Sequence, residues 1–387
     1  MTKLKIAYLC DLSPLEGWTY SGGNARIYNA LRQQGAEIDI ITPSWFVAEP
    51  LRRMIHRMPD SINLRARWRA HLLLSRIIGR GVSKLLKATQ YDVLFCPYSF
   101  QSLAHVKRPK HTLQVFTADA TPTVYRQSAI GQAFKSNAVS RRFDPMITRA
   151  ETRIFQSCDL NLWPSAWQKD RADSVYGLEA GKSLVVPWGA NIPNPAEQNT
   201  SPPPTKDGLH LLLVGRDWFA KGGPLVFETL VALRKRGINA HLSVIGCVPP
   251  PFHTNDAMTV YPSLDKSDPT QFAQFEALFR AAHFLVMPSF ESYGFAFCEA
   301  SAYGLPSICL KLGGIPVIDG VNGHALEATA TADDFANCLQ SYLGTPTRYS
   351  ELRKSARQYY QTTLNWTAWG ERVMALMSGM RSKNDVN

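Results

Sequence analysis

Short apolar runs alternate with longer amphipathic stretches along most of the chain. Apolar runs bounded by turn residues predict buried strands, and apolar positions spaced three or four apart predict helices. In the first half this pattern predicts strands at 5–10, 37–41, 93–96, 112–117, 160–163 and 184–186, with a helix at 24–34. In the second half it predicts strands at 209–214, 241–245, 284–287 and 307–310, with helices at 224–236 and 295–303. Strands that alternate with helices indicate an α/β fold with mainly parallel sheets.

The alternation is interrupted at 187–208, where proline and polar residues dominate. Such a composition is typical of a linker, and a chain of 387 residues has the right length for two domains. From 348 onward the chain is predicted to be helical. Ligands of parallel sheets bind at the carboxyl ends of the strands, which predicts a binding site in a cleft between two such domains.

Composition and charge narrow the class of protein. Hydrophobic residues make up 45% of the chain, the first apolar run is too short for a signal-peptide core, and no apolar stretch approaches the length of a spanning helix. The seven cysteines are scattered and include no CxxC pair, which favours reduced thiols in a cytoplasmic protein. The net charge is +11, and the positive excess falls within residues 1–190, which indicates an anionic partner for that half.

Two glutamates stand eight positions apart in the stretch that begins ESYGFAFCE. Glu291 is expected in the loop between a strand and the helix that follows it. Glu299 is expected more than one turn into this helix, on the side that can point toward the same loop. The backbone N–H groups of 294–297 begin this helix and are expected to be unpaired, which suits a diphosphate. Both carboxylates would then lie beside hydroxyl groups of a sugar or ribose. The alternative is that Glu291 caps the helix and Glu299 is a solvated surface side chain.

Glu291 and Glu299, followed by the small residues 300–302, Gly304 and Pro306, resemble the signature of retaining GT-B glycosyltransferases. The resemblance is strongest to family four, the group 1 glycosyltransferases, and it extends over nearly the whole chain. It implies a GT-B fold, in which two Rossmann-like domains face each other across a cleft.

The resemblance also implies how the chain is divided and what each part binds. Residues 1–190 are expected to bind the acceptor and residues 191–360 the nucleotide sugar, while a last helix at about 361–387 packs back onto the first domain. Glu299 is expected to bind the ribose hydroxyls, and Glu291 the transferred sugar or its oxocarbenium-like centre. The backbone N–H groups that would hold the diphosphate belong to Gly294, Phe295 and Ala296.

A second candidate is the stretch VGRDWFAKGG, residues 214–223. Arg216 follows a predicted strand, and Lys221 lies just before a helix that Pro224 helps to start. Both cations can point from one loop toward the same ligand, and the resemblance implies that they hold the donor's diphosphate. Fixed cations stabilise the negative charge that builds on the leaving oxygens when the glycosidic bond breaks. The alternative is a solvated surface pair.

Two further candidates lie in the first half. Gly22 and Gly23 follow the first predicted strand and allow the backbone to approach a ligand closely. In the resembled family this loop approaches the donor phosphates and the transferred sugar, although a plain turn is the alternative. Asp119 stands after the predicted strand 112–117, where the family usually has a histidine. An aspartate can bind sugar hydroxyls or orient an acceptor, and the alternative is a helix cap.

A basic stretch covers residues 51–87, with Asp60 as its only acid. Part of it recurs at helical spacing beside an apolar stripe, which predicts a basic amphipathic helix suited to an anionic membrane surface. The alternative is a covering helix with a solvated basic face. Its basic residues are Arg52, Arg53, Arg57, Arg65, Arg67, Arg69, Arg76, Arg80, Lys84 and Lys87.

Together these features predict a retaining, metal-independent glycosyltransferase without a cofactor. It is expected to move a hexose from a nucleotide-diphosphate sugar to a glycan or lipid-linked acceptor, in the synthesis of cell-surface polysaccharide or glycolipid. It is expected in the cytoplasm, and the basic stretch favours a peripheral position on the inner face of the membrane. Nucleic acid is not an expected partner because no binding motif accompanies the charge. Two alternatives stay open, a nucleotide-sugar epimerase of the same fold and a non-catalytic nucleotide-sugar-binding protein.

Overall fold

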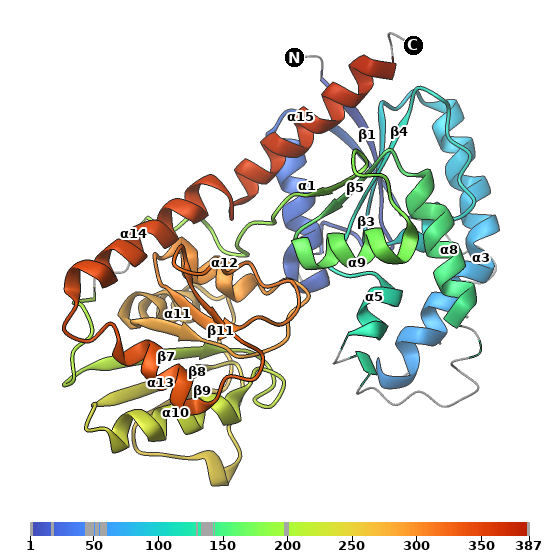
Figure 1. The fold of residues 1–387 in the computed structure, drawn as a ribbon. Helices are drawn as coiled ribbons and strands as arrows, with labels where there is room; N and C mark the ends of the chain where they lie inside the picture. The colour runs from blue at the N-terminus through green and yellow to red at the C-terminus, as the bar shows by residue number, and fades with distance from the viewer. Residues whose placement is uncertain are drawn as a thin grey trace. The chain divides into compact units, whose positions relative to one another are not determined.

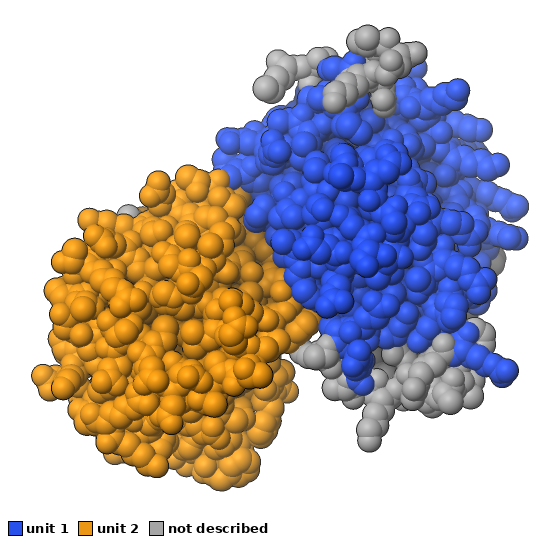
Figure 2. Space-filling view, viewed as in Figure 1, with its two compact units in different colours: residues 1–187, 366–387 blue, residues 188–365 orange. Residues whose placement is uncertain are grey.

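The computed structural model describes residues 3–16, 19–42, 50, 54, 60–128, 131–132, 142, 144–196 and 201–384. The chain divides into two compact units, which Figure 2 shows in different colours. Unit 1 comprises residues 1–187 and 366–387, and unit 2 comprises residues 188–365. Each unit is built on its own parallel sheet with helices packed against it (Figure 1), so the α/β prediction is confirmed.

The sheet of unit 1 has six parallel strands in the order β2-β1-β3-β4-β5-β6. All positions of β3 and β4 are buried, which explains why these strands appear in the sequence as continuous apolar runs. The strands are β1 (Lys5–Leu9), β2 (Glu37–Ile41), β3 (Val93–Pro97), β4 (Leu113–Thr117), β5 (Leu160–Trp163) and β6 (Ser183–Val185).

The helices of unit 1 begin and end where their capping residues stand. Ser165 accepts a hydrogen bond from the Gln168 N–H at the start of α9, and Gly177 ends that helix in a left-handed conformation. The helical elements are η1 (Thr19–Gly22), α1 (Gly23–Gln33), α3 (Asp60–Ala88), α4 (Phe100–Leu103), α5 (Pro122–Gln127), α8 (Asp144–Ser157), α9 (Ala166–Tyr176) and α15 (Trp366–Asn384).

The C-terminal helix α15 belongs to unit 1 and lies beside α1 (Figure 1). A glycine permits this approach, because a Cβ at Gly370 would lie 3.0 Å from the Ala30 carbonyl oxygen. Trp369 is fully buried, and its ring meets the ring of Phe95 edge-on at 6.3 Å between centroids. An apolar side chain of this size in the last helix therefore completes the core around the sheet.

Unit 2 repeats the plan with a six-stranded parallel sheet in the order β12-β11-β10-β7-β8-β9. Its strands are β7 (Leu209–Val214), β8 (Ala240–Ile245), β9 (Met258–Tyr261), β10 (Phe284–Val286), β11 (Ser307–Leu310) and β12 (Gly323–Leu326). Its helices are α10 (Gly223–Lys235), η3 (Pro251–His253), α11 (Pro269–Ala281), α12 (Phe295–Ala302), α13 (Ala332–Gln340) and α14 (Pro346–Thr362).

Two features differ from the sequence predictions, and part of one predicted segment lies outside the described residues. The edge strands β9 and β12 were not predicted, because each is short and β12 begins at a glycine that looks like part of a turn. The predicted linker is not uniformly exposed, since Trp188, Ala190 and Ile192 are buried in unit 2. Within the basic stretch 51–87, Arg52, Arg53 and Arg57 lie outside the described residues, as do the side chains of Arg65 and Arg67.

Candidate active site

Two of the predicted site residues, Lys221 and Glu291, meet in unit 2. Lys221 comes from the loop between β7 and α10, and Glu291 from the loop between β10 and α12. The Lys221 ammonium donates to Glu291 Oε1, and the Ser289 hydroxyl donates to the same oxygen at 2.7 Å. Gly294, not Glu291, is the N-cap residue of α12, so the capping alternative for Glu291 is wrong. The pair places one cation and one carboxylate at the carboxyl ends of neighbouring strands.

Glycines allow these two loops to touch. Gly222 has a φ of +74°, and a Cβ there would lie 2.7 Å from the carbonyl oxygen of Pro288. The aliphatic part of Lys221 passes so close to Gly215 that a Cβ at that glycine would lie 2.2 Å from the lysine Cγ. The motif G-R-x4-K-G thus has a packing reason as well as a chemical one. Arg216 follows Gly215 directly and is exposed, so it is available to an anionic ligand.

Glu299 is almost completely buried, with 3% of its surface exposed, so the solvated-surface alternative is wrong. Its Oε1 accepts a hydrogen bond from the Lys266 ammonium at 2.6 Å. Lys266 comes from the segment between β9 and α11, and its ammonium also lies 4.4 Å from the centre of the Phe275 ring. The sequence reasoning missed Lys266, because it lies 33 positions from Glu299 in a segment without a motif.

The start of α12 lies next to the Glu291 side chain, because a Cβ at Gly294 would lie 3.2 Å from the Glu291 Cγ. Gly294 caps the helix in a left-handed conformation, and Phe295 and Ala296 form its half-buried first turn. The Phe297 N–H donates to the Gly294 carbonyl at 3.1 Å. The expectation that all four N–H groups of 294–297 are unpaired is therefore wrong for Phe297, whose N–H already has a partner in the first helical turn.

A glycine turn closes the other side of the Glu291 loop. The Gly314 N–H donates to the Glu291 carbonyl oxygen at 2.8 Å. Gly313 has a φ of +74°, and a Cβ there would lie 2.1 Å from that same oxygen, so only glycine fits. The backbone of Glu291 is thus fixed independently of the hydrogen bonds that its side chain makes.

In unit 1 the glycines Gly22 and Gly23 lie between η1 and α1, at the carboxyl end of β1. Gly22 is the N-cap of α1 with a φ of +85°, and Gly23 is buried. The two preceding residues, Tyr20 and Ser21, also have left-handed backbones, with φ of 51° and 55°. Such conformations cost non-glycine residues roughly 1–3 kcal/mol and are concentrated at functional sites.

The loops after β3 and β4 complete this end of the sheet. Tyr98 has a φ of +60°, and its ring stacks on that of Tyr20 with centroids 3.9 Å apart. Burial raises the pKa of Tyr98, and the nearby charge of Asp119 raises it further. Thr121, not Asp119, caps α5, because its hydroxyl accepts from the Val124 N–H. The capping alternative for Asp119 is therefore wrong, and Asp119 joins a tyrosine pair that the sequence did not predict.

Within the part of the chain that the structure describes, no group of three or more His, Cys, Asp or Glu side chains gathers at distances suited to a metal ion. The helices in those same ranges also lack the combination of length and apolar composition that crossing a bilayer requires.

The two α/β units, with their six-stranded parallel sheets, have the architecture of the GT-B class. Among solved structures, the chain resembles the lipopolysaccharide outer core galactosyltransferase WaaB at a TM-score of 0.64 and 16% identity, covering 97% of this chain and 100% of that one. A glycosyltransferase from Rickettsia africae gives 0.60 and 13%, with 98% and 99% covered. HepE of Anabaena, solved in complex with UDP, gives 0.60 and 12%, with 97% and 100% covered. At these identities the likeness shows the fold, and the GT-B prediction is confirmed.

Two family models match successive parts of the chain, "Glycosyltransferase Family 4" at residues 24–192 and "Glycosyl transferases group 1" at residues 208–345. The chain belongs to the group 1, or family-four, glycosyltransferases. This finding confirms the family predicted from the glutamate signature.

Curated relatives share part of the sequence. A D-inositol 3-phosphate glycosyltransferase of Corynebacterium glutamicum is 27% identical over 191 residues, which are 45% of this chain and 44% of the relative. The protein of the same name from Actinosynnema mirum is 28% identical over 203 residues, 47% of this chain and 49% of the relative. The chain thus spans about half the length of the curated relatives it matches.

Proposed function

We propose that the protein is a retaining, metal-independent glycosyltransferase that moves a hexose from a nucleoside-diphosphate sugar to a glycan or lipid-linked acceptor, in the synthesis of cell-surface polysaccharide or glycolipid. The observation that carries the proposal is the group in unit 2 formed by Lys221, Glu291 and the start of α12, with Arg216 exposed in the same loop as Lys221. Cations and a helix start suit a diphosphate, and the carboxylate beside them suits sugar hydroxyls.

The chemistry of the leaving group explains the arrangement. Departure of a nucleoside diphosphate concentrates negative charge on its oxygens, and Arg216, Lys221 and the first amides of α12 stabilise that charge as it forms. Glu291, held by Ser289, positions Lys221 and lies beside the sugar. Glu299 binds the ribose hydroxyls. In a retaining reaction of this kind, the leaving phosphate takes the proton of the acceptor hydroxyl.

We propose that unit 1 binds the acceptor at the carboxyl ends of β1, β3 and β4. Gly22 and Gly23 allow close approach of a ligand, Asp119 offers a carboxylate to hydroxyl groups, and the stacked pair Tyr20 and Tyr98 offers an aromatic wall. The left-handed backbones of both tyrosines support a functional assignment, because their cost must be offset elsewhere in the fold.

The same proposal places the enzyme in the cytoplasm, against an anionic inner membrane surface that presents the acceptor. The basic excess in residues 1–190 supports this assignment. A lipid-linked acceptor would then meet unit 1 without leaving the bilayer surface.

A donor panel tests the first half of the proposal. Melting temperatures are measured with UDP-, GDP- and ADP-sugars in the presence of a chelator, for the wild type and for Glu299→Ala. UDP-sugars lead the panel because HepE was solved with UDP and with UDP-glucose. One nucleotide is expected to raise the melting temperature, and Glu299→Ala to lose most of that rise. If no donor changes the melting temperature of the wild type, the enzyme proposal fails.

An acceptor panel tests the second half. With the donor from the first panel, product formation is followed on lipopolysaccharide core oligosaccharides and on D-inositol 3-phosphate, the acceptors suggested by the names of the similar proteins. Tyr20→Ala and Asp119→Ala are expected to raise the acceptor KM and leave the donor-induced rise in melting temperature intact. Conversion of the donor without any acceptor would instead identify an epimerase.

A further inference from the structure

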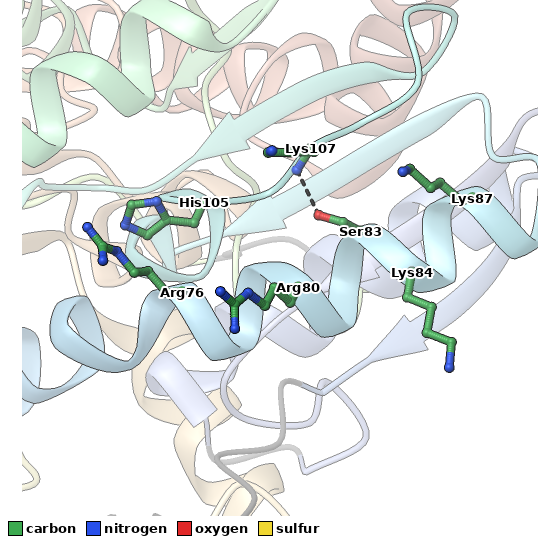
Figure 3. Close-up of a pocket in the computed structure, with 7 residues that line it drawn as sticks. All are labelled: Arg76, Arg80, Ser83, Lys84, Lys87, His105 and Lys107. Atoms are coloured by element: carbon green, nitrogen blue, oxygen red, sulfur yellow. Dashed lines mark hydrogen bonds between the residues drawn. The ribbon is translucent and has the colours of Figure 1, made fainter.

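An open hollow of about 560 Å³ lies on unit 1 between helix α3 and the segment that follows α4. Figure 3 shows Arg76, Ser83 and Lys87 on the side of α3 that faces this segment, while Lys84 points away from it. We call this feature the α3 hollow. Its lining residues are Arg76, Arg80, Ser83, Lys84, Lys87, His105 and Lys107.

The two walls of the α3 hollow are fixed to each other. A Cβ at Gly79 would lie 2.6 Å from the backbone of His105, so the helix approaches this segment as closely as a glycine allows. One turn further along, the Ser83 hydroxyl accepts a hydrogen bond from the Lys107 N–H at 2.8 Å (Figure 3). The cationic side chains are therefore anchored on a rigid frame, which limits the entropy lost when they bind a ligand.

The charge of the α3 hollow is not balanced by acids. Five of its lining side chains are permanent cations, none of its lining residues is an acid, and within the described ranges no ion pair joins those five to a carboxylate. Several other cations of unit 1 have such a partner, as Arg108 has in Asp159 at 2.9 Å. Like charges gathered without counter-charges repel each other, so their arrangement favours an anion.

Exposed apolar side chains lie on the same helix. Leu73, Ile77 and Leu85 are 73%, 37% and 48% exposed, although leucine and isoleucine are usually buried. On a helical projection Leu73 and Ile77 share the exposed face of α3 with Arg80 and Lys84, whereas Leu85 lies about 100° round the helix from Lys84. Apolar side chains beside cations fit a bilayer surface, where they enter the acyl boundary while the cations meet phosphates.

We propose that the α3 hollow binds the phosphate of an anionic membrane lipid and thereby docks unit 1 on the bilayer. The shared chemistry is a phosphate group, and the exposed Leu73 and Ile77 select a lipid over free phosphate. This inference deepens the proposed membrane association by assigning it to a defined site formed by α3 together with His105 and Lys107.

Vesicle flotation of the full chain tests the site. Neutral vesicles contain phosphatidylcholine, and anionic vesicles contain an equimolar mixture with phosphatidylglycerol. The variant Arg76→Ala/Lys107→Ala removes one cation from each wall, and Lys235→Ala/Lys354→Ala removes two exposed cations from unit 2 as the matched control. Near an anionic surface each cation is worth about 1 kcal/mol, so the first variant is expected to bind anionic vesicles about 30-fold more weakly than the wild type.

The matched control is expected to bind anionic vesicles within about threefold of the wild type, because its charges lie outside the α3 hollow. Equal flotation of the Arg76/Lys107 variant and the control would overturn the assignment of the site. It would leave the wider membrane proposal to be judged by the difference between anionic and neutral vesicles. Both variants should keep the donor-induced rise in melting temperature, which separates a failure of this site from a failure of the transferase proposal.

Two further arms identify the source of the phosphate. Leu73→Ser/Ile77→Ser is expected to weaken vesicle binding without changing the weak binding of inorganic phosphate, which can be followed by phosphorus NMR. Unchanged vesicle binding by this variant, with competition by inorganic phosphate, would show a free-phosphate site and overturn the lipid assignment. Tighter binding of a single-stranded RNA oligonucleotide than of anionic vesicles, lost in the Arg76/Lys107 variant, would overturn it in favour of nucleic acid.

Discussion

The Lys266 ammonium lies 2.6 Å from the buried carboxylate of Glu299 and forms an ion pair with it. The Lys266 side chain is 38% exposed, whereas the Glu299 side chain is 4% exposed, so the pair joins an interior acid to a cation that is partly in water. In the proposed reaction the ribose hydroxyls approach this same carboxylate. Lys266 therefore occupies Glu299 before the donor arrives and must share it afterwards.

Lys266→Met is expected to lower the melting temperature of the free protein, because it leaves an interior carboxylate without its cation. The loss should amount to about 1 kcal/mol, since one partner stays partly in water. The donor-induced rise in melting temperature should become larger in this variant, because ribose hydroxyls then supply partners that the free carboxylate lacks. Thermal unfolding with and without the donor measures both effects, with Lys354→Met as the control. A smaller rise in the variant would instead mean that Lys266 binds the donor directly.

Lys221→Met is expected to lower kcat by about 10²–10³-fold, the loss typical of a group that stabilises developing negative charge. Arg216→Ala should act in the same direction, because it removes the other cation of the same loop. Steady-state kinetics of both variants against Lys235→Met, an exposed lysine of unit 2, provides the comparison. A rise in the donor KM with unchanged kcat would show that the cation only binds the donor and has no part in the chemical step.

Acid is expected to destabilise unit 2 through His283, whose two ring nitrogens are already used. Nδ1 accepts from the His210 N–H at 2.8 Å, and Nε2–H donates to the Pro202 carbonyl at 2.9 Å. Burial lowers the pKa of His283 from 6.5 to about 4, so between these values the unfolded chain binds the extra proton. Stability should fall by roughly 3 kcal/mol as the pH falls from 6.5 toward 4.

Urea unfolding of wild type and His283→Asn at about pH 7 and about pH 5 measures the contribution of His283 to this loss of stability in acid. Asparagine keeps an acceptor for the His210 N–H but does not titrate. The variant should therefore be less stable at neutral pH and lose less stability in acid. Parallel pH profiles for the two proteins would assign the acid sensitivity to other groups.

Glu151 should give the opposite pH dependence in unit 1. Its carboxyl group accepts hydrogen bonds from the N–H and the hydroxyl of Thr123 at the start of α5. Burial raises the pKa of Glu151 from 4.5 to about 7, against the lowering effect of those hydrogen bonds. The folded state thus binds the extra proton between these values, and the stabilisation present below 4.5 is lost as the pH rises through 7.

Glu151→Gln removes this titration and can still accept from Thr123. The stability of the variant relative to wild type should rise by roughly 3 kcal/mol between about pH 4.5 and pH 8, as measured by urea unfolding. A constant difference across this range would show that folding does not raise the pKa of Glu151.

Much of the fold could be predicted, because buried parallel strands such as β3 and β4 leave continuous apolar runs. The start of β12 could not, because Gly323 looks like a turn residue. In the structure it allows a close strand approach, since a Cβ there would lie 1.9 Å from the Ser307 carbonyl oxygen. Glycine occurs both in turns and where two strands approach closely, and the sequence alone does not distinguish these two cases.

Lys221 and Glu291 could be predicted as site residues because each stands in a sequence motif that can be recognised without the structure. Lys266 and Tyr98 were not predictable, for two different reasons. Lys266 joins Glu299 through the fold alone, from a loop with no pattern of its own. The left-handed backbone of Tyr98 is imposed by its surroundings, because a tyrosine has no local preference for that conformation.

The place of α15 has a consequence for biosynthesis. The ribosome makes residues 1–187 of unit 1 first and unit 2 next, and Trp369 and the rest of α15 are made only after unit 2. Until α15 has been made, the face of α1 around Ala30 is exposed, whereas the six strands described in the unit 2 sheet have all been synthesised and can pair. Unit 1 can therefore complete its core only after unit 2 has been synthesised, the reverse of the usual vectorial order, and a nascent chain stalled before residue 366 would expose apolar surface to chaperones.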